Sequence, residues 1–157
     1  MQITPFLWFD NNVEDAMDYY AGIFPDFRAS NVVRNGPKAP GPDGGVMMAS
    51  FELCGQQFMA LNGGPLFPFT EAVSFFVSVD TQDEVDYLWT ALTADGGAES
   101  QCGWLKDKFG LSWQIVPKAL GELMGDPDPA AAGRVVEAMM GMQKIDIAAL
   151  QAAHDAV

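Results

Sequence analysis

The stretch Gln101–Pro117, QCGWLKDKFGLSWQIVP, carries the strongest fold signal in this chain. Each of its two arms contains a tryptophan, and the Lys-Asp-Lys-Phe-Gly segment between them is typical of a tight turn. The second arm is rich in strand-favouring residues and ends at Pro117, which cannot extend a hydrogen-bonded ladder. The stretch therefore predicts two adjacent strands joined by a turn, with Asp107 in a charged, solvated tip between two lysines.

Upstream, the chain begins with a strand and a helix. An aromatic-rich strand is expected at Ile3–Asp10, after which Asn11 or Asn12 can cap a helix. Apolar residues recur at helical spacing as far as Phe24, and a proline then stops the helix. A second strand is expected at Phe27–Val33.

Two further strands complete this first half. Residues 35–45, NGPKAPGPDGG, are too rich in Gly and Pro for regular structure and predict a mobile surface loop. Val46–Cys54 alternates as a strand does, and Gln57–Leu61 returns beside it. One face of the alternating strand is expected to carry Met47, Ala49, Phe51 and Leu53.

The same order of elements then recurs. Val73–Asp80 predicts a strand, and Thr81 with Glu84 forms a capping box that opens a helix. The segments VEDAMDYY and QDEVDYLW occupy matching places in the two halves, which indicates a tandem repeat. The predicted fold class is therefore α+β, with tandem βαβββ repeats that form a curved mixed sheet, helices outside and a cup inside.

The last part of the chain predicts a helical tail. Ala130–Met142 has a helical pattern, and Asp146 can cap a second helix through Ala153. Packing against the domain is the simpler explanation of its apolar stripe, and a partner-binding or dimer surface is the alternative. We expect a single domain over residues 1–157, with repeats at about 1–65 and 70–120 and the tail at about 126–157.

Composition limits the partners. With 8 Lys and Arg against 21 Asp and Glu, the formal charge of -13 argues against nucleic acid and anionic membranes. The start, MQITPFLWFD, lacks the features of a signal peptide, and no stretch approaches a membrane span, so we expect a cytoplasmic protein. Cys54 and Cys102 are expected to be small buried thiols without a disulfide.

Strand alternation also predicts a ligand site. The wholly apolar set Phe75, Val77 and Val79 should meet the helices, so the alternate residues should face the cup. A mostly apolar concavity with a few polar groups is typical of small-molecule sites. The candidate ligand-binding residues are Met59, Leu61, Ser74, Phe76, Cys102, Trp104, Ser112 and Gln114.

Four segments together resemble a known family: FLWFDNNVEDAMDYY, FMALNGGP, CGWLKDKFGLSWQIVP and MQKIDIAAL. They are similar to PhnB-like proteins, a branch of the vicinal oxygen chelate superfamily that includes glyoxalase I, bleomycin-resistance proteins and extradiol dioxygenases. The family is also labelled 3-demethylubiquinone-9 3-methyltransferase. The resemblance implies the glyoxalase-like fold and, because members are usually dimers, a homodimer.

The resemblance also implies positions for a divalent metal, which superfamily enzymes hold with His and Glu. These positions fall near Ile3, Met59, Ser74 and Gln114, and none of the four is a good ligand. We therefore expect no metal and no other cofactor. The double glycines do not predict an S-adenosylmethionine pocket, because they stand at hairpin or helix ends.

The resulting hypothesis is a metal-free protein that binds a small molecule of unknown identity in the cup. One alternative is an enzyme, either a metal-dependent lyase or isomerase with other ligands or a methyltransferase. The other alternative is an interaction protein that dimerises through the tail.

Overall fold

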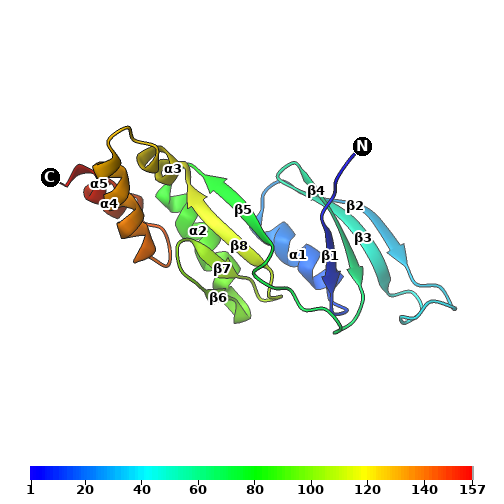
Figure 1. Cartoon of the computed structure of the whole chain (residues 1–157). Helices are drawn as coiled ribbons and strands as arrows, with labels where there is room; N and C mark the ends of the chain where they lie inside the picture. Colours follow the sequence, from blue (N-terminus) through cyan, green and yellow to red (C-terminus); the bar gives the residue numbers. More distant parts are fainter. Residues whose placement is uncertain (157) are drawn as a thin grey trace. The chain divides into compact units, whose positions relative to one another are not determined.

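The computed structural model describes residues 1–156; Val157, the last residue of the predicted tail, lies outside them. The chain forms two compact units, Met1–Phe69 and the part from Thr70 onward. Each unit contains four strands and a helix in the predicted order, which confirms the α+β class and the tandem βαβββ repeat (Figure 1). Where one curved sheet was expected, hydrogen bonds group the described strands into two mixed sheets, one in each unit.

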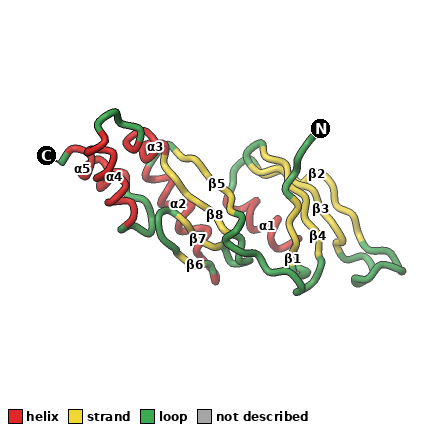
Figure 2. Tube along the Cα trace, viewed as in Figure 1, coloured by secondary structure: helices red, strands yellow, loops and turns green. Residues whose placement is uncertain are grey.

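The first unit is a four-stranded sheet with one helix. Its strand order is β1-β4-β3-β2, with β1 parallel to β4 and the other pairs antiparallel (Figure 2). The elements are β1 (Phe6–Phe9), α1 (Val13–Ile23), β2 (Phe27–Arg34), β3 (Val46–Leu53) and β4 (Gln56–Asn62).

The core of this unit lies between α1 and one face of the sheet. Tyr20 of α1 is fully buried and stacks on Phe51 of β3, which in turn stacks on Phe58 of β4. Burial of side chains this large contributes roughly 1.5–3 kcal/mol each. Met47 departs from the predicted buried face, because the β2–β3 register shifts beside it and leaves it exposed.

The start of α1 is capped from the sheet. Asn12 occupies the N-cap position, but its side chain makes no capping hydrogen bond, so the predicted local cap was wrong. Instead, Asn62 at the end of β4 accepts from the Val13 backbone N–H (3.0 Å) and donates to the Val46 carbonyl (2.9 Å). One amide therefore joins the helix to two strands.

The second unit repeats the arrangement. Its strand order is β5-β8-β7-β6, with β5 parallel to β8, and the predicted capping box between Thr81 and Glu84 is present at the start of α2. The elements are β5 (Ser74–Val79), α2 (Gln82–Thr93), the 3₁₀ turn η1 (Ala94–Gly96), β6 (Ala98–Glu99), β7 (Trp104–Lys106) and β8 (Ser112–Pro117).

The β7–β8 hairpin confirms the two strands predicted from the opening stretch, but its turn differs from expectation. Asp107 is 2% exposed rather than solvated. Its carboxylate accepts hydrogen bonds from the backbone N–H groups of Phe109 (2.9 Å) and Leu111 (3.1 Å) and from the indole Nε1–H of Trp113 (2.9 Å). The predicted charged tip is therefore a buried carboxylate that organises the turn.

The tail belongs to the second unit. It comprises α3 (Lys118–Met124), α4 (Pro129–Met140) and α5 (Ile147–Asp155), and its core consists of Leu120, Val135, Ile145 and Leu150. The helices α4 and α5 were predicted, with Asp146 as the cap of α5, whereas α3 was missed. Gln82 at the start of α2 ties the tail down by hydrogen bonds to the backbone of Ile145 and Ile147. None of the helices over residues 1–156 has the length and apolar character that a membrane crossing requires.

A histidine near the end of α5 gives the tail a pH dependence. His154 Nδ1 lies 2.9 Å from Asp155 Oδ1, and His154 Nε2 lies 3.1 Å from Asp126 Oδ2. These two interactions raise the pKa of His154 above its usual 6.5. A raised folded-state pKa means that the stabilisation is fully present below the unfolded pKa and is lost as the pH rises through the folded one.

We therefore expect the melting temperature of the wild-type protein to fall between about pH 5.5 and about pH 8.5 by more than that of His154→Gln. Differential scanning calorimetry of both proteins across this range is the measurement. Because the other titrating groups are common to both, equal pH slopes would contradict this prediction.

Candidate functional site

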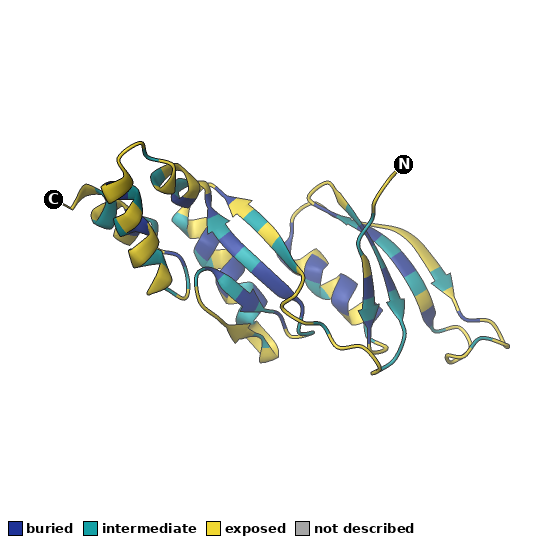
Figure 3. Cartoon of the chain, viewed as in Figure 1, coloured by how far each residue is buried: buried dark blue, intermediate teal, exposed yellow. Residues whose placement is uncertain are grey.

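The face of the second sheet that α2 does not cover carries mixed polar and apolar side chains. Figure 3 shows buried and less buried positions mixed along the strands of this sheet. On β8, Ser112, Gln114 and Val116 share one face, with Ser112 itself buried, and Trp113 and Ile115 are buried on the other face. Because paired strands place partner residues on the same face, the register extends this surface across β5 and β7.

Two cross-strand rows form the centre of this surface. The first consists of Lys106, Ser112 and Ser74, and the second consists of Trp104, Gln114 and Phe76. Five of the eight ligand-binding candidates thus lie side by side: Ser74, Phe76, Trp104, Ser112 and Gln114.

Gln114 links the two rows. Its Nε2 donates to Ser74 Oγ over 2.9 Å. This leaves the Gln114 carbonyl oxygen as an acceptor and the Ser74 hydroxyl as a donor that can meet a ligand. Gln114 is therefore hydrogen-bonded within the sheet and still has an acceptor oxygen for a ligand.

Ser112 is a buried hydroxyl without a partner. It is 1% exposed, and its Oγ makes no hydrogen bond within residues 1–156. It lines a pocket of about 220 Å³ together with Trp104, Lys106 and Glu71. An unsatisfied buried polar group costs about 1–3 kcal/mol, so this hydroxyl favours an additional hydrogen-bonding group at the pocket.

An ion pair stands at the same pocket. Lys106 Nζ lies 2.5 Å from Glu71 Oε1, and the hydrogen bond from Lys106 lowers the pKa of Glu71. Both side chains are partly exposed, so the pair contributes little to stability and can open to admit a competing anion. The pocket therefore combines a cation, a free hydroxyl and an indole.

The other three candidates lie elsewhere. Met59 and Leu61 are on the uncovered face of the first sheet, opposite Phe6 and Trp8 of β1. Cys102 is in the turn before β7, where its backbone N–H donates to the Met142 carbonyl and its Sγ lies 3.9 Å from Met140 Sδ. The structure therefore places Cys102 against the tail, apart from the two rows.

The cysteines are free, as expected, but Cys54 is exposed at the β3–β4 turn, so its predicted burial was wrong. Partial burial and then the carboxylate of Asp26 raise the pKa of the Cys54 thiol. A raised pKa lowers the thiolate fraction near neutrality, which makes this thiol a weak nucleophile.

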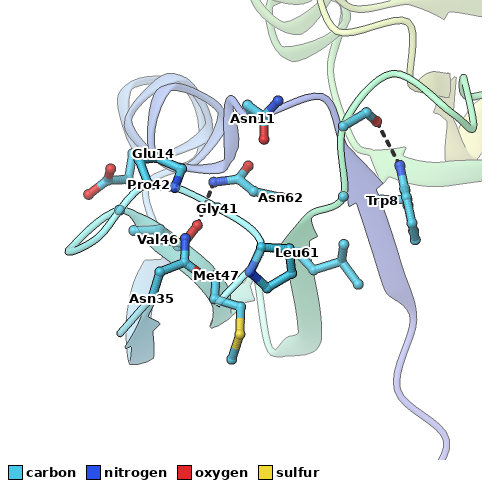
Figure 4. A pocket seen from close by; sticks show the side chains of 14 residues that line it. Trp8, Asn11, Glu14, Asn35, Gly41, Pro42, Val46, Met47, Leu61 and Asn62 are labelled. Atoms are coloured by element: carbon cyan, nitrogen blue, oxygen red, sulfur yellow. Dashed lines mark hydrogen bonds between the residues drawn. The ribbon is translucent and has the colours of Figure 1, made fainter. Parts of the chain in front are cut away.

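A pocket of about 850 Å³ lies in the first unit (Figure 4). Its walls include Leu61 of β4, one of the eight candidates, together with Trp8 of β1 and the segment 40–42 of the Gly/Pro-rich loop. Sequence reasoning missed Trp8 and the loop, and it had no signal for the loop, because Gly, Pro and Asn are ordinary turn residues.

A divalent metal does not fit the implied positions. Ser74 and Gln114 hydrogen-bond to each other, Met59 is a thioether, and Ile3 is an exposed apolar side chain. Within residues 1–156, no group of three or more His, Cys, Asp or Glu side chains is placed to hold a metal ion. The donor set therefore supports no metal-dependent step.

A Gly-rich nucleotide pocket does not fit either. Such a pocket needs glycines between a strand and the helix that follows it. The β1–α1 connection is Asp10-Asn11-Asn12 and the β5–α2 connection is Asp80-Thr81, so both lack glycine.

The two βαβββ units, each a four-stranded mixed sheet with a helix, define a protein of the vicinal oxygen chelate (glyoxalase-like) fold class. The model of the 3-demethylubiquinone-9 3-methyltransferase family matches residues 1–116, and the chain belongs to this PhnB-like family. No match was found among curated protein sequences.

Solved structures agree with this assignment. A PhnB protein from Bacillus cereus, described as a 3-demethylubiquinone-9 3-methyltransferase, shares 33% identity at a TM-score of 0.68, over 74% of this chain and 99% of that one. A protein from Pseudomonas aeruginosa shares 23% identity at a TM-score of 0.60, over 74% and 97%. The fosfomycin resistance protein FosX from Listeria monocytogenes, solved with Mn(II) and sulfate, shares the fold at 12% identity and a TM-score of 0.53, over 74% and 89%.

Proposed function

We propose that this protein binds a small organic molecule on the uncovered face of its second sheet, without a metal ion. The observation that carries the proposal is Ser112, whose buried hydroxyl lacks a partner and lines a pocket. A ligand oxygen that accepts from this hydroxyl would remove the cost of leaving it unsatisfied.

The neighbouring groups define the ligand class. Lys106 offers a positive charge once Glu71 is displaced, and Trp104 offers a flat apolar surface. A carbonyl or carboxylate attached to a small apolar body matches this combination. The volume of about 220 Å³ is below the usual range for drug-sized ligands, so the molecule is small or only part of it enters.

A second depression on this sheet extends the proposed binding surface. Phe76 and Ser78 of β5 line a second depression of about 400 Å³ together with Val116, Lys118 and Glu122. A longer ligand can therefore continue along the sheet from Ser112 past the Trp104–Gln114–Phe76 row.

Ser112→Ala should separate binding from stability. Removal of an unsatisfied buried hydroxyl should raise the free energy of unfolding by about 1–2 kcal/mol, while binding of a benzoate probe weakens roughly tenfold. Urea unfolding measures the first, and titration of the Trp104 indole N–H signal by NMR measures the second. Ser30→Ala, an exposed change on β2 outside the proposed binding surface, serves as the matched control and should alter stability by less than about 0.5 kcal/mol.

A loss of stability in Ser112→Ala would show that the hydroxyl is satisfied in the free protein and would remove the main support for the site. The absence of any saturable benzoate effect on Trp104 would contradict the proposed ligand class. Saturable binding of S-adenosylmethionine would instead favour the enzyme alternative.

We also propose that the protein is a cytoplasmic homodimer. The homodimer rests on the family alone, and native mass spectrometry of the untagged protein should decide the oligomeric state. The same spectrum would detect a copurifying small molecule, and deletion of the tail would test whether α3–α5 contribute to the dimer.

A further inference from the structure

The Gly/Pro-rich loop at residues 35–45 is held in place by the rest of the first unit. Arg34 donates through Nη1 to the Gly44 carbonyl (3.0 Å) and pairs through Nη2 with Glu14 on α1 (3.1 Å). The Gly44 N–H donates in turn to the Asn35 carbonyl (2.9 Å). The loop that composition predicted to be mobile is therefore tied to β2 and α1.

The pocket of about 850 Å³ lies under this loop and is within the size range of small-molecule sites (Figure 4). It spans the ends of β1 and β4 and the start of β3. Its apolar wall consists of Trp8, Pro40, Pro42, Val46, Met47 and Leu61.

Asn35 is a polar group of this pocket whose side chain has no hydrogen-bond partner among residues 1–156. The residue is 8% exposed and lines the pocket. Gly41 packs so closely against it that a Cβ at that position would overlap the Asn35 Nδ2. The amide therefore borders the pocket with hydrogen-bonding capacity that water or a ligand can use.

The other polar side chains of the pocket each have at least one partner. Asn11 donates through Nδ2 to Asp10 Oδ1 (3.2 Å). The Asn62 side chain accepts a hydrogen bond from the Val13 N–H and donates one to the Val46 carbonyl, and Glu14 forms an ion pair with Arg34. No unpaired cation lines the pocket, so an anionic ligand would find no counter-charge there. This favours a neutral ligand that Asn35 recognises.

Trp8 supplies a flat surface of fixed orientation. Its Nε1–H donates to the Gly64 carbonyl (2.8 Å), and its ring lies so close to Gly63 that a Cβ there would overlap it. Phe67 packs edge-on against the same ring. Figure 4 shows Trp8 and Asn35 on different sides of the pocket, so a planar ligand that pairs with the amide would extend toward the indole.

We propose that this pocket of the first unit is a binding site for a neutral planar heterocycle whose edge carries an adjacent hydrogen-bond donor and acceptor. An asparagine amide pairs with such an edge through two hydrogen bonds, as it does with the N6 and N7 atoms of adenine. The chemistry is shared by purine nucleosides and by planar carboxamides such as nicotinamide.

Adenosine and nicotinamide are the probes for NMR titration of ¹⁵N-labelled protein. We expect adenosine, nicotinamide or both to shift the Asn35 side-chain NH₂ pair, which is identified by its absence in Asn35→Asp, and the Trp8 indole N–H. Asn35→Ala should weaken this binding about tenfold or more, since one bidentate pair discriminates by roughly 5- to 150-fold. Asn31→Ala, an exposed change on β2 outside the pocket, should leave binding unchanged.

Ligand-side changes test the same contact without altering the protein. With adenosine, N6,N6-dimethyladenosine lacks the donor and 7-deazaadenosine lacks the acceptor, and each should bind about tenfold more weakly to the wild type but not to Asn35→Ala. Failure of both probes to give a saturable shift would overturn the proposal, as would binding that Asn35→Ala does not affect. These signals arise in the first unit, so their failure is independent of the benzoate and Ser112 result.

Discussion

Asp107→Ala is expected to lower the free energy of unfolding by about 3–5 kcal/mol. The carboxylate is 2% exposed and accepts from two backbone N–H groups of the β7–β8 turn and from the Trp113 indole. Truncation would leave these donors without their acceptor. Because a buried unsatisfied donor costs about 1–3 kcal/mol and bonds to a charged group are stronger than average, the losses accumulate.

Urea unfolding followed by far-UV circular dichroism is the measurement, since it does not depend on the fluorescence of Trp113. Asp107→Asn keeps the size and one acceptor oxygen, so it should lose less stability than Asp107→Ala. Asp43→Ala, an exposed change in the 35–45 loop, should stay within about 0.5 kcal/mol of the wild type. A loss below about 1 kcal/mol for Asp107→Ala would mean that water replaces the carboxylate at little cost.

Gly97→Ala is expected to lower the free energy of unfolding by about 3 kcal/mol. A Cβ at this position would lie 2.5 Å from the Leu92 carbonyl oxygen, 2.7 Å from the Thr93 Cα and 2.8 Å from the Lys106 carbonyl oxygen. All three are backbone atoms, at the end of α2 and on β7, so no side chain can rotate away. The glycine is therefore needed for the close approach of the helix end to the sheet.

Gly133→Ala is the matched control. Gly133 is an exposed residue inside α4, and a Cβ there would meet no atom within 4 Å. Alanine should therefore raise stability by about 0.5–1 kcal/mol, because it restricts the unfolded chain more than glycine does. Chemical denaturation of both variants is the test, and a change of the same sign in both would refute the close-contact explanation for Gly97.

The class of fold and most of the elements could be predicted because their signals are local. The Thr81–Glu84 capping box and the Asp146 cap act within three residues of chain, and both are present in the structure. Strand alternation placed Ser74 and Phe76 of β5 on the same face as Ser112 and Gln114 of β8, and the strand register agrees. Five candidates for the site therefore lie together, since a period of two needs no knowledge of the partner strand.

The remaining features of the site could not be predicted, because they depend on which strands pair and in what register. Strand alternation does not reveal that the Ser112 hydroxyl has no hydrogen-bond partner. Nor does it reveal that Cys102 lies in a turn against the tail. It also does not reveal Lys106 as a member of the Ser112 row, because Lys106 reads as part of a charged tip. Each of these depends on which strands are neighbours and on what else approaches them.

The sequence by itself determined the repeat, the strand and helix order, the face of each strand and the lack of good metal ligands at the expected positions. Only the tertiary structure decided which polar groups are buried and what they meet. Asn62 caps a helix 49 residues away, Asp107 is enclosed by its own turn, and the Ser112 hydroxyl is buried without a partner beside a pocket. The physical reason is that backbone preference acts between near neighbours, whereas the desolvation and pairing of a polar group depend on distant segments that folding brings together.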